Sequence, residues 1–116
     1  MKEDFHKKLK ILMDEYAHFV YKISRDFPKE ELYGLTSQLR RATLSVILNY
    51  IEGFARQGEK SKQSFYKISY GFLKESKYLL HFSLVEKYLA QNDYKIAMNM
   101  AEKIGAMLWG ILKNKK

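Results

Sequence analysis

A glutamate and a histidine in this chain have the spacing of a metal site. Glu15 and His18 stand three positions apart in a stretch with helical periodicity. Di-iron four-helix bundles build their sites from such Glu-x-x-His pairs on two different helices, together with two further glutamates. Glu52 and Glu75 could supply the extra carboxylates, but the set of ligands is incomplete. We therefore expect no metal site and no cofactor.

Nucleophilic catalysis would have to use serine, threonine or lysine, because the chain contains no cysteine. No histidine is placed beside a serine, and no strand-to-helix elbow or glycine-rich loop precedes one. Serines inside helices more often allow helices to pack closely than act as nucleophiles. Five of them fall inside predicted helices, namely Ser37, Ser45, Ser69, Ser76 and Ser83. We expect that the protein is not an enzyme.

Basic residues follow one another along the predicted third helix. Lys60, Lys67, Lys74 and Lys77 are spaced by seven, seven and three positions, which places them on one side of a helix. A basic stripe of this kind is typical of phosphate binding, and nearby tyrosines could stack on bases. The alternative is a solvated, lysine-rich surface with no ligand. The candidate nucleic-acid-binding residues are Arg56, Lys60, Lys62, Lys67, Lys74 and Lys77.

Two carboxylates interrupt lines of apolar residues. Glu52 follows the apolar half of the second helix. Glu75 falls at the same three-and-four spacing as the apolar residues of the third helix. A charged group on a buried line needs a partner. Arg40 and Arg41 are the candidates if these helices run antiparallel. The four residues are interpreted as a polar clamp between the two helices, with a ligand site as the alternative.

The elements that must position these residues are four helices. Apolar residues recur at steps of three and four over approximately residues 4–26, 28–56, 61–90 and 93–113. Pro28 separates the first two helices, because the residue before a proline is pushed out of the helical region. Short connections favour an all-α, antiparallel up-down-up-down four-helix bundle. Residues 1–116 are expected to form a single domain.

The second helix is the expected centre of the bundle. Residues 35–56 carry apolar side chains on more than one helical face. This apolar surface is larger than the three neighbouring helices of the same chain need for packing, so a further partner is expected to cover part of it. Aromatic anchors are typical of subunit interfaces. We therefore expect a homo-oligomer, with Tyr50, Phe54 and Trp109 as candidate interface residues.

Composition limits the class of protein. The 116 residues are 47% hydrophobic and 29% charged, as in globular proteins, and the net charge is +8 with most of the excess in residues 59–116. Such a charge suits an anionic partner such as nucleic acid. The absence of cysteine fits a reducing compartment, and no stretch is apolar enough for a signal peptide or a membrane span. A cytoplasmic protein with no membrane partner is expected.

The sequence FPKEELYGLTSQLRRA, followed by S-V-x-x-N-x-x-E-G, resembles the four helix bundle protein family, which is also named for intervening sequences in bacterial 23S ribosomal RNA genes. Weaker similarity continues through the third and fourth helices. One departure is Ile47, where the family often has proline. The match rests on Phe27, Pro28, Glu31, Gly34, Leu35, Gln38, Leu39, Arg40, Arg41, Ala42, Ser45, Asn49, Glu52 and Gly53, and more weakly on Phe65, Ile68, Gly71, Leu73 and Glu75.

The resemblance implies a four-helix bundle that assembles into a homo-oligomer, commonly a ring-like pentamer, without enzymatic activity. It also points to the related accessory proteins of diversity-generating retroelements, which bind a reverse transcriptase and nucleic acid. Two functions stay open at this point. The first is a basic bundle that binds RNA or DNA without sequence specificity. The second is a protein-interaction scaffold or adaptor, for instance for a reverse transcriptase.

Overall fold

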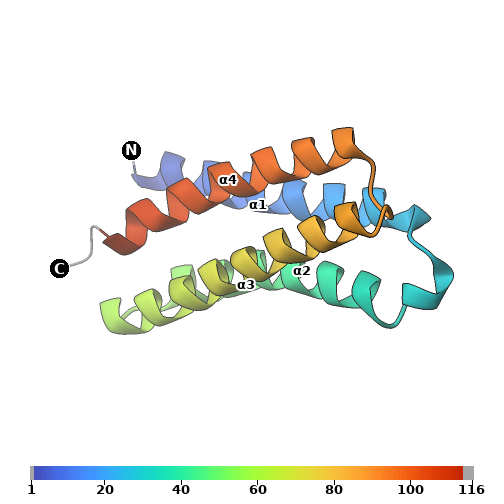
Figure 1. Cartoon of the computed structure of the whole chain (residues 1–116). Helices are drawn as coiled ribbons and strands as arrows, with labels where there is room; N and C mark the ends of the chain where they lie inside the picture. Colours follow the sequence, from blue (N-terminus) through green and yellow to red (C-terminus); the bar gives the residue numbers. More distant parts are fainter. Residues whose placement is uncertain (1, 114–116) are drawn as a thin grey trace.

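The computed structural model describes residues 2–113, which form four α-helices and two short 3-10 turns (Figure 1). Helix α1 spans Lys2–Ile23, α2 spans Leu35–Ala55, α3 spans Glu59–Val85 and α4 spans Gln91–Lys113. The turns η1, Ser24–Asp26, and η2, Lys29–Glu31, lie between α1 and α2. Within the described residues, no helix is both long enough and apolar enough to cross a bilayer.

The helices form one elongated bundle measuring 44 × 24 × 19 Å. Each helix packs on its neighbours in the chain, and α1 also packs on α4, so that α1 and α3 occupy one diagonal and α2 and α4 the other (Figure 1). Short connections reverse the chain direction each time. The predicted all-α, up-down-up-down four-helix bundle is therefore confirmed.

Helices α2 and α3 make the most extensive contact in the bundle, because small residues line it. The Ser69 hydroxyl is buried and donates a hydrogen bond of 2.6 Å to the Val46 carbonyl oxygen of α2. At Gly53 a Cβ atom would lie 2.8 Å from the Tyr66 ring and 3.1 Å from the Phe65 Cβ. Glycine at this position therefore sets how closely the two helices approach.

The buried face of α3 is not the most apolar line of its sequence. Three serines spaced by seven residues, Ser69, Ser76 and Ser83, are fully buried beside Leu73 and Leu80. Each serine hydroxyl donates to a carbonyl oxygen, either in its own helix or in α2, so no polar group is left unsatisfied there. The line that sequence periodicity favoured is only partly buried, because Leu79 and Leu89 are buried and Ile68 and Phe82 are exposed. Its members are Phe65, Ile68, Phe72, Leu79, Phe82 and Leu89.

The connection between α1 and α2 differs from the predicted continuous helix over residues 28–56. Pro28 has an extended conformation, with ψ 139°, and only the short turn η2 follows before α2 begins at Leu35. The Glu31 carboxylate accepts a hydrogen bond of 3.1 Å from the Leu35 N–H. This carboxylate supplies one acceptor for the unsatisfied N–H groups at the start of α2, so the helix begins here.

Helix α3 ends at Val85, earlier than the predicted boundary near residue 90. Lys87 has a φ of 66°, in the left-handed region, which ends the helix. The Lys87 N–H donates to the Leu84 carbonyl oxygen and the Tyr88 N–H donates to that of Ser83. This pair of bonds is the Schellman motif, formed here with lysine in place of the usual glycine.

Candidate nucleic-acid interface

Three of the six predicted basic residues lie on one outward line of α3. Lys60, Lys67 and Lys74 are exposed and follow each other at seven-residue steps, or about 10 Å apart along the axis at 1.5 Å per residue. None of the three forms an ion pair with any described residue. We call these three residues the lysine line. Their ammonium groups are available to solvent and to an anionic ligand.

The other three predicted basic residues have partners within the bundle. Arg56 donates to the Glu52 carboxylate at 2.8 Å, and Lys77 lies 3.0 Å from the Glu102 carboxylate of α4. Lys62 donates a hydrogen bond of 2.9 Å to the Phe54 carbonyl oxygen at the end of α2. Arg56, Lys62 and Lys77 are therefore less available to an anionic ligand than the lysine line is.

The predicted polar clamp of Arg40, Arg41, Glu52 and Glu75 is wrong. Glu52 and Glu75 are exposed, and Glu52 pairs with Arg56, the residue that follows the end of α2. Arg41 is also exposed. The reason is the orientation of α3, which buries Ser76 and turns the neighbouring Glu75 outward.

Arg40 instead joins α2 to the end of α1. Its Nε donates to the Ser24 hydroxyl at 2.9 Å and its Nη2 donates to the Tyr21 carbonyl oxygen at 3.3 Å. The guanidinium also lies over the Tyr21 ring, 4.7 Å from the centroid. Arg40 therefore fixes the turn after α1, a structural contact that requires a forked donor.

The three candidate interface residues lie in different surroundings. Tyr50 is 1% exposed and packs inside the bundle, so its assignment to a subunit interface is wrong for this fold. Phe54 and Trp109 are each about half exposed. Phe54 packs on His6 of α1, whereas Trp109 packs on Tyr70 at the seam between α3 and α4. The two exposed rings therefore belong to separate surfaces.

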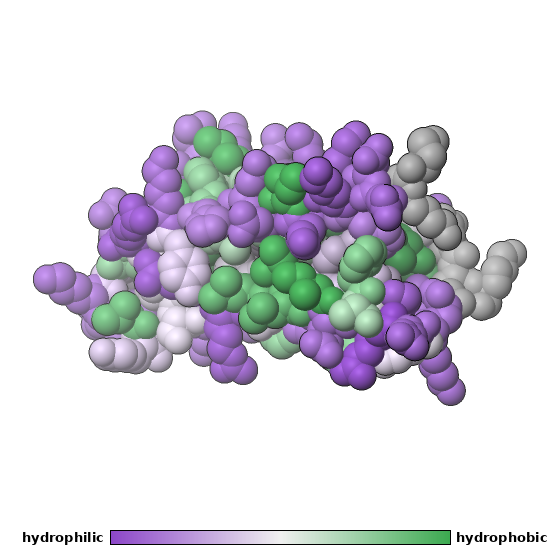
Figure 2. Space-filling view, turned by 180° about the vertical axis from the view of Figure 1, so that it is seen from behind, coloured by the Kyte–Doolittle hydropathy of each residue, from purple (hydrophilic) through white to green (hydrophobic). Residues whose placement is uncertain are grey.

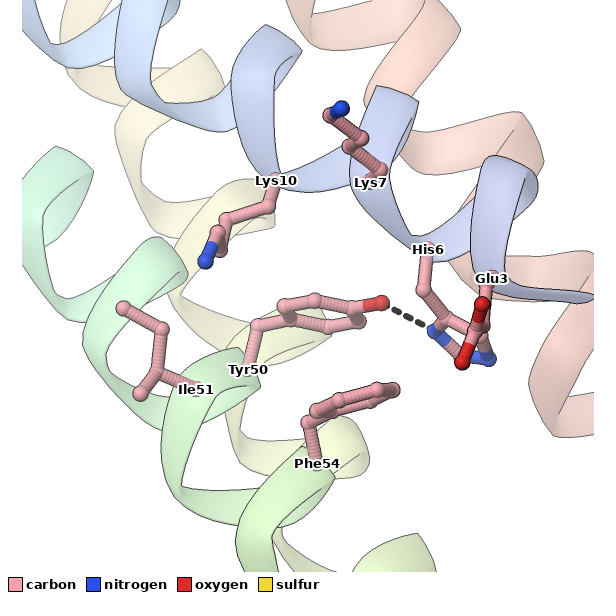
Figure 3. A pocket seen from close by; sticks show the side chains of 7 residues that line it. All are labelled: Glu3, His6, Lys7, Lys10, Tyr50, Ile51 and Phe54. Atoms are coloured by element: carbon pink, nitrogen blue, oxygen red, sulfur yellow. Dashed lines mark hydrogen bonds between the residues drawn. The ribbon is translucent and has the colours of Figure 1, made fainter.

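An aromatic cluster that the sequence did not reveal joins α1 to α2. The His6 ring is hydrogen-bonded through Nδ1 to the Tyr50 hydroxyl and lies 5.0 Å, centroid to centroid, from the Phe54 ring (Figure 3). Tyr50 in turn stacks on Tyr66 of α3 at 5.3 Å. Burial raises the pKa of Tyr50, and the nearby Tyr66 adds to the effect, so its phenol stays protonated.

A pocket of about 300 Å³ opens beside this cluster. Figure 3 shows the aromatic rings on one side and the Lys7 ammonium pointing away from the His6–Tyr50 hydrogen bond. The cluster holds the first turns of α1 against α2. This packing role explains why these residues are there, without a ligand. The only sequence signal was a histidine next to the apolar line of α1, which periodicity alone does not distinguish from a surface residue. The lining residues are Glu3, His6, Lys7, Lys10, Tyr50, Ile51 and Phe54.

The residues with metal-site spacing do not converge. His18 lies 3.4 Å from the Asp14 carboxylate on the exposed face of α1, and Glu15 is exposed beside them. A second Glu-x-x-His spacing, from Glu3 to His6, lies on the same helix, so the two spacings do not come from different helices as a di-iron site requires. Among residues 2–113, no group of three or more histidine or acidic side chains could hold a metal ion.

The model of the 23S rRNA-intervening sequence protein family matches residues 7–110. The chain belongs to this family. A solved structure of similar fold is a protein of unknown function from the S23 ribosomal protein family of Bacteroides thetaiotaomicron, with a TM-score of 0.87 and 19% sequence identity over 94% of this chain and 98% of that one. No curated protein matches. The family membership confirms the resemblance seen in the sequence, and the solved structure supports the four-helix fold.

Proposed function

We propose that this member of the 23S rRNA-intervening sequence protein family is a non-enzymatic, homo-oligomeric bundle that binds RNA or DNA through the phosphate backbone. The lysine line carries the proposal. Lys60, Lys67 and Lys74 are exposed, aligned on α3 and without ion-pair partners among the described residues. The net charge of +8 adds long-range attraction for a polyanion.

Phosphate contacts of this kind give affinity without sequence preference. Each neutralised phosphate releases a condensed counterion, so the logarithm of the binding constant falls with the logarithm of the salt concentration. Three lysines would contribute a slope of about −2 to −3 per subunit, depending on whether the ligand is single-stranded or double-stranded. A chain that offers only three such contacts binds weakly unless several copies act together.

Assembly would supply those copies. Three of the exposed apolar residues of α2, Leu44, Leu48 and Ile51, follow each other at steps of four and three, and we call them the α2 apolar face. Figure 2 shows apolar side chains gathered near the middle of the face seen from behind. A face of this kind marks an association surface, and another copy of the chain is the occupant we propose. The expected stoichiometry is the pentamer that the resemblance implies, in which repeated lysine lines bind multivalently.

The test is a salt titration of nucleic-acid binding with matched charge variants. We expect the unmodified protein to bind RNA or DNA of any sequence at about 50 mM salt and to lose affinity steeply toward about 200 mM. The double variant Lys67→Glu, Lys74→Glu should weaken binding to every sequence alike and flatten the salt slope. The control is Lys8→Glu, Lys22→Glu, which makes the same charge change on exposed positions of α1, diagonally across the bundle. Equal losses in the two variants would show that the total charge, and not the lysine line, determines binding.

A second candidate function is a protein adaptor, such as an accessory protein of a reverse transcriptase. The observation that favours it is the exposure of large apolar side chains before α2, where Tyr33 is 93% exposed beside the exposed Leu32. Exposed aromatic rings of this kind are used as anchors at protein interfaces. If the unmodified protein retains no nucleic acid at about 50 mM salt, where phosphate contacts are strong, the adaptor replaces the first proposal.

A further inference from the structure

Two aromatic rings form a pair at the seam between α3 and α4. The ring centroids of Tyr70 and Trp109 lie 5.9 Å apart, with an angle of 35° between the planes. Tyr70 is half-buried against the bundle, whereas 52% of Trp109 is exposed to solvent. The indole is therefore held in place by Tyr70 and still open to a ligand. It is also the only tryptophan in the chain.

Lysines lie beside this pair on both helices. The Lys74 ammonium lies 5.4 Å from the centroid of the Tyr70 ring, and Lys67 precedes Tyr70 by three residues on the same side of α3. Lys113 follows Trp109 by four residues on α4 and is exposed. The rings thus lie next to two members of the lysine line.

The acidic residue on this seam does not oppose an anion. The Glu102 carboxylate lies 3.0 Å from the Lys77 ammonium, so its charge is matched within the protein. Helix α4 occupies the corner of the bundle diagonal to α2. In a closed ring the α2 apolar face packs on a different surface of the next subunit, and a ligand on the seam between α3 and α4 requires that this surface is not the seam.

We propose that Trp109 and Tyr70 form a stacking platform for an unpaired base of single-stranded RNA or DNA, with the adjoining phosphates on Lys67 and Lys74. This inference rests on the proposed function and narrows its ligand to single strands. Every base has a flat face that stacks on an aromatic ring, so the platform needs no sequence preference. Bases inside a duplex are already stacked and paired, so a duplex can use only the lysines.

The fluorescence of Trp109 tests the proposal directly, because no other tryptophan contributes to the signal. The protein is titrated at about 50 mM salt, where phosphate contacts are strong, with single-stranded oligothymidylate, oligouridylate, an abasic strand of equal length, and a duplex. The abasic strand keeps the phosphates and lacks the bases. We expect quenching by either base-containing single strand, and binding of the abasic strand and of the duplex without that quenching.

Substitution supplies the second measurement. Trp109→Leu should weaken binding of the oligothymidylate by roughly 5- to 150-fold, the range that stacking on an aromatic ring gives per base. The same variant should leave affinity for the abasic strand unchanged, and Trp109→Phe should retain most of the affinity for the oligothymidylate. Tyr33→Leu, which removes an exposed ring before α2, is the matched control and should bind like the unmodified protein.

The two hypotheses fail in different ways. If the base-containing strands bind no more tightly than the abasic strand and leave Trp109 fluorescence unchanged, the stacking platform is overturned while phosphate binding stands. If no strand binds at about 50 mM salt, the proposed function fails and the platform fails with it. The fluorescence titration uses the unmodified protein, so it decides the matter even if Trp109→Leu does not fold.

Discussion

The hydroxyl of Tyr16 donates a hydrogen bond of 2.7 Å to the Ser76 oxygen, joining α1 to α3 across the diagonal of the bundle. The direction follows from Ser76, whose own proton is donated to the Leu73 carbonyl oxygen at 2.8 Å. Both side chains are fully buried. A buried polar pair with every donor used fixes how α1 and α3 are placed relative to each other.

The Tyr16 phenol should make stability fall at high pH. Burial raises its pKa from 10.0 to about 12, an effect larger than the opposing one of the Ser76 hydrogen bond. The folded chain therefore keeps this proton to a higher pH than the unfolded chain, and the stabilisation that is complete below pH 10 is lost as pH rises toward 12. Over this window the free energy of unfolding should fall by about 1 to 3 kcal/mol more in the unmodified protein than in Tyr16→Phe. Urea unfolding across the window measures the difference, with Tyr33→Phe as the exposed control; equal slopes for all three proteins would contradict the prediction.

Gly53 and Gly71 form a matched pair for helix packing. Gly53→Ala places a methyl group 2.8 Å from the Tyr66 ring where α2 packs on α3, and we expect a loss of about 1 to 3 kcal/mol from overpacking. Gly71 has no atom within 4 Å of its added Cβ, so Gly71→Ala should raise stability by about 0.5 to 1 kcal/mol through helix propensity alone. Thermal unfolding of both variants gives the comparison. A stabilised Gly53→Ala protein would mean that α2 and α3 separate more easily than this packing implies.

Lys87 should be a site where glycine stabilises the protein. Its φ of 66° costs an ordinary side chain about 1 to 2 kcal/mol that glycine does not lose. We expect Lys87→Gly to raise the free energy of unfolding by about 1 kcal/mol, a value reduced by the greater freedom of glycine in the unfolded chain. Lys87→Ala removes the same charge and keeps the strained backbone, so it should show no such gain. If the alanine variant gains as much as the glycine variant, charge and not backbone conformation is responsible.

The α2 apolar face should control the size of the assembly. Leu48 is 60% exposed at the centre of this face, and Leu48→Glu would bury a charge wherever another copy covers it. Light scattering of the unmodified protein at micromolar concentration should give a multiple of the 13.8 kDa chain mass, five in the expected pentamer. Leu48→Glu should reduce it to the single-chain mass. A single-chain mass for the unmodified protein would exclude the assembly.

The sequence by itself determined the four helices and their order. Apolar residues at steps of three and four mark a helix wherever one face is buried, and Pro28 and the polar residues around Gly58 interrupt the pattern. The same reasoning failed over residues 28–34, because a hydrogen bond between Glu31 and the Leu35 N–H decides where α2 begins. It also extended α3 too far, since periodicity does not show that Lys87 adopts a left-handed conformation.

Tertiary structure alone decided which face of α3 is buried. Serine looks like a surface residue in a sequence, but Ser69, Ser76 and Ser83 satisfy their hydroxyls on backbone carbonyl oxygens and are small enough to let helices approach. That choice turned Glu75 to solvent and removed the predicted clamp.

The partners of the charged residues were likewise decided by the fold. The spacing of the lysines could be read from the sequence, but not that Lys77 pairs with Glu102 while Lys67 and Lys74 stay exposed. The pairing of Tyr70 with Trp109 joins residues from two helices that meet only once the bundle has formed. Periodicity indicates which face of a single helix is buried. Whether a lysine or an aromatic ring is free to bind a ligand depends instead on the side chains that the neighbouring helix places beside it.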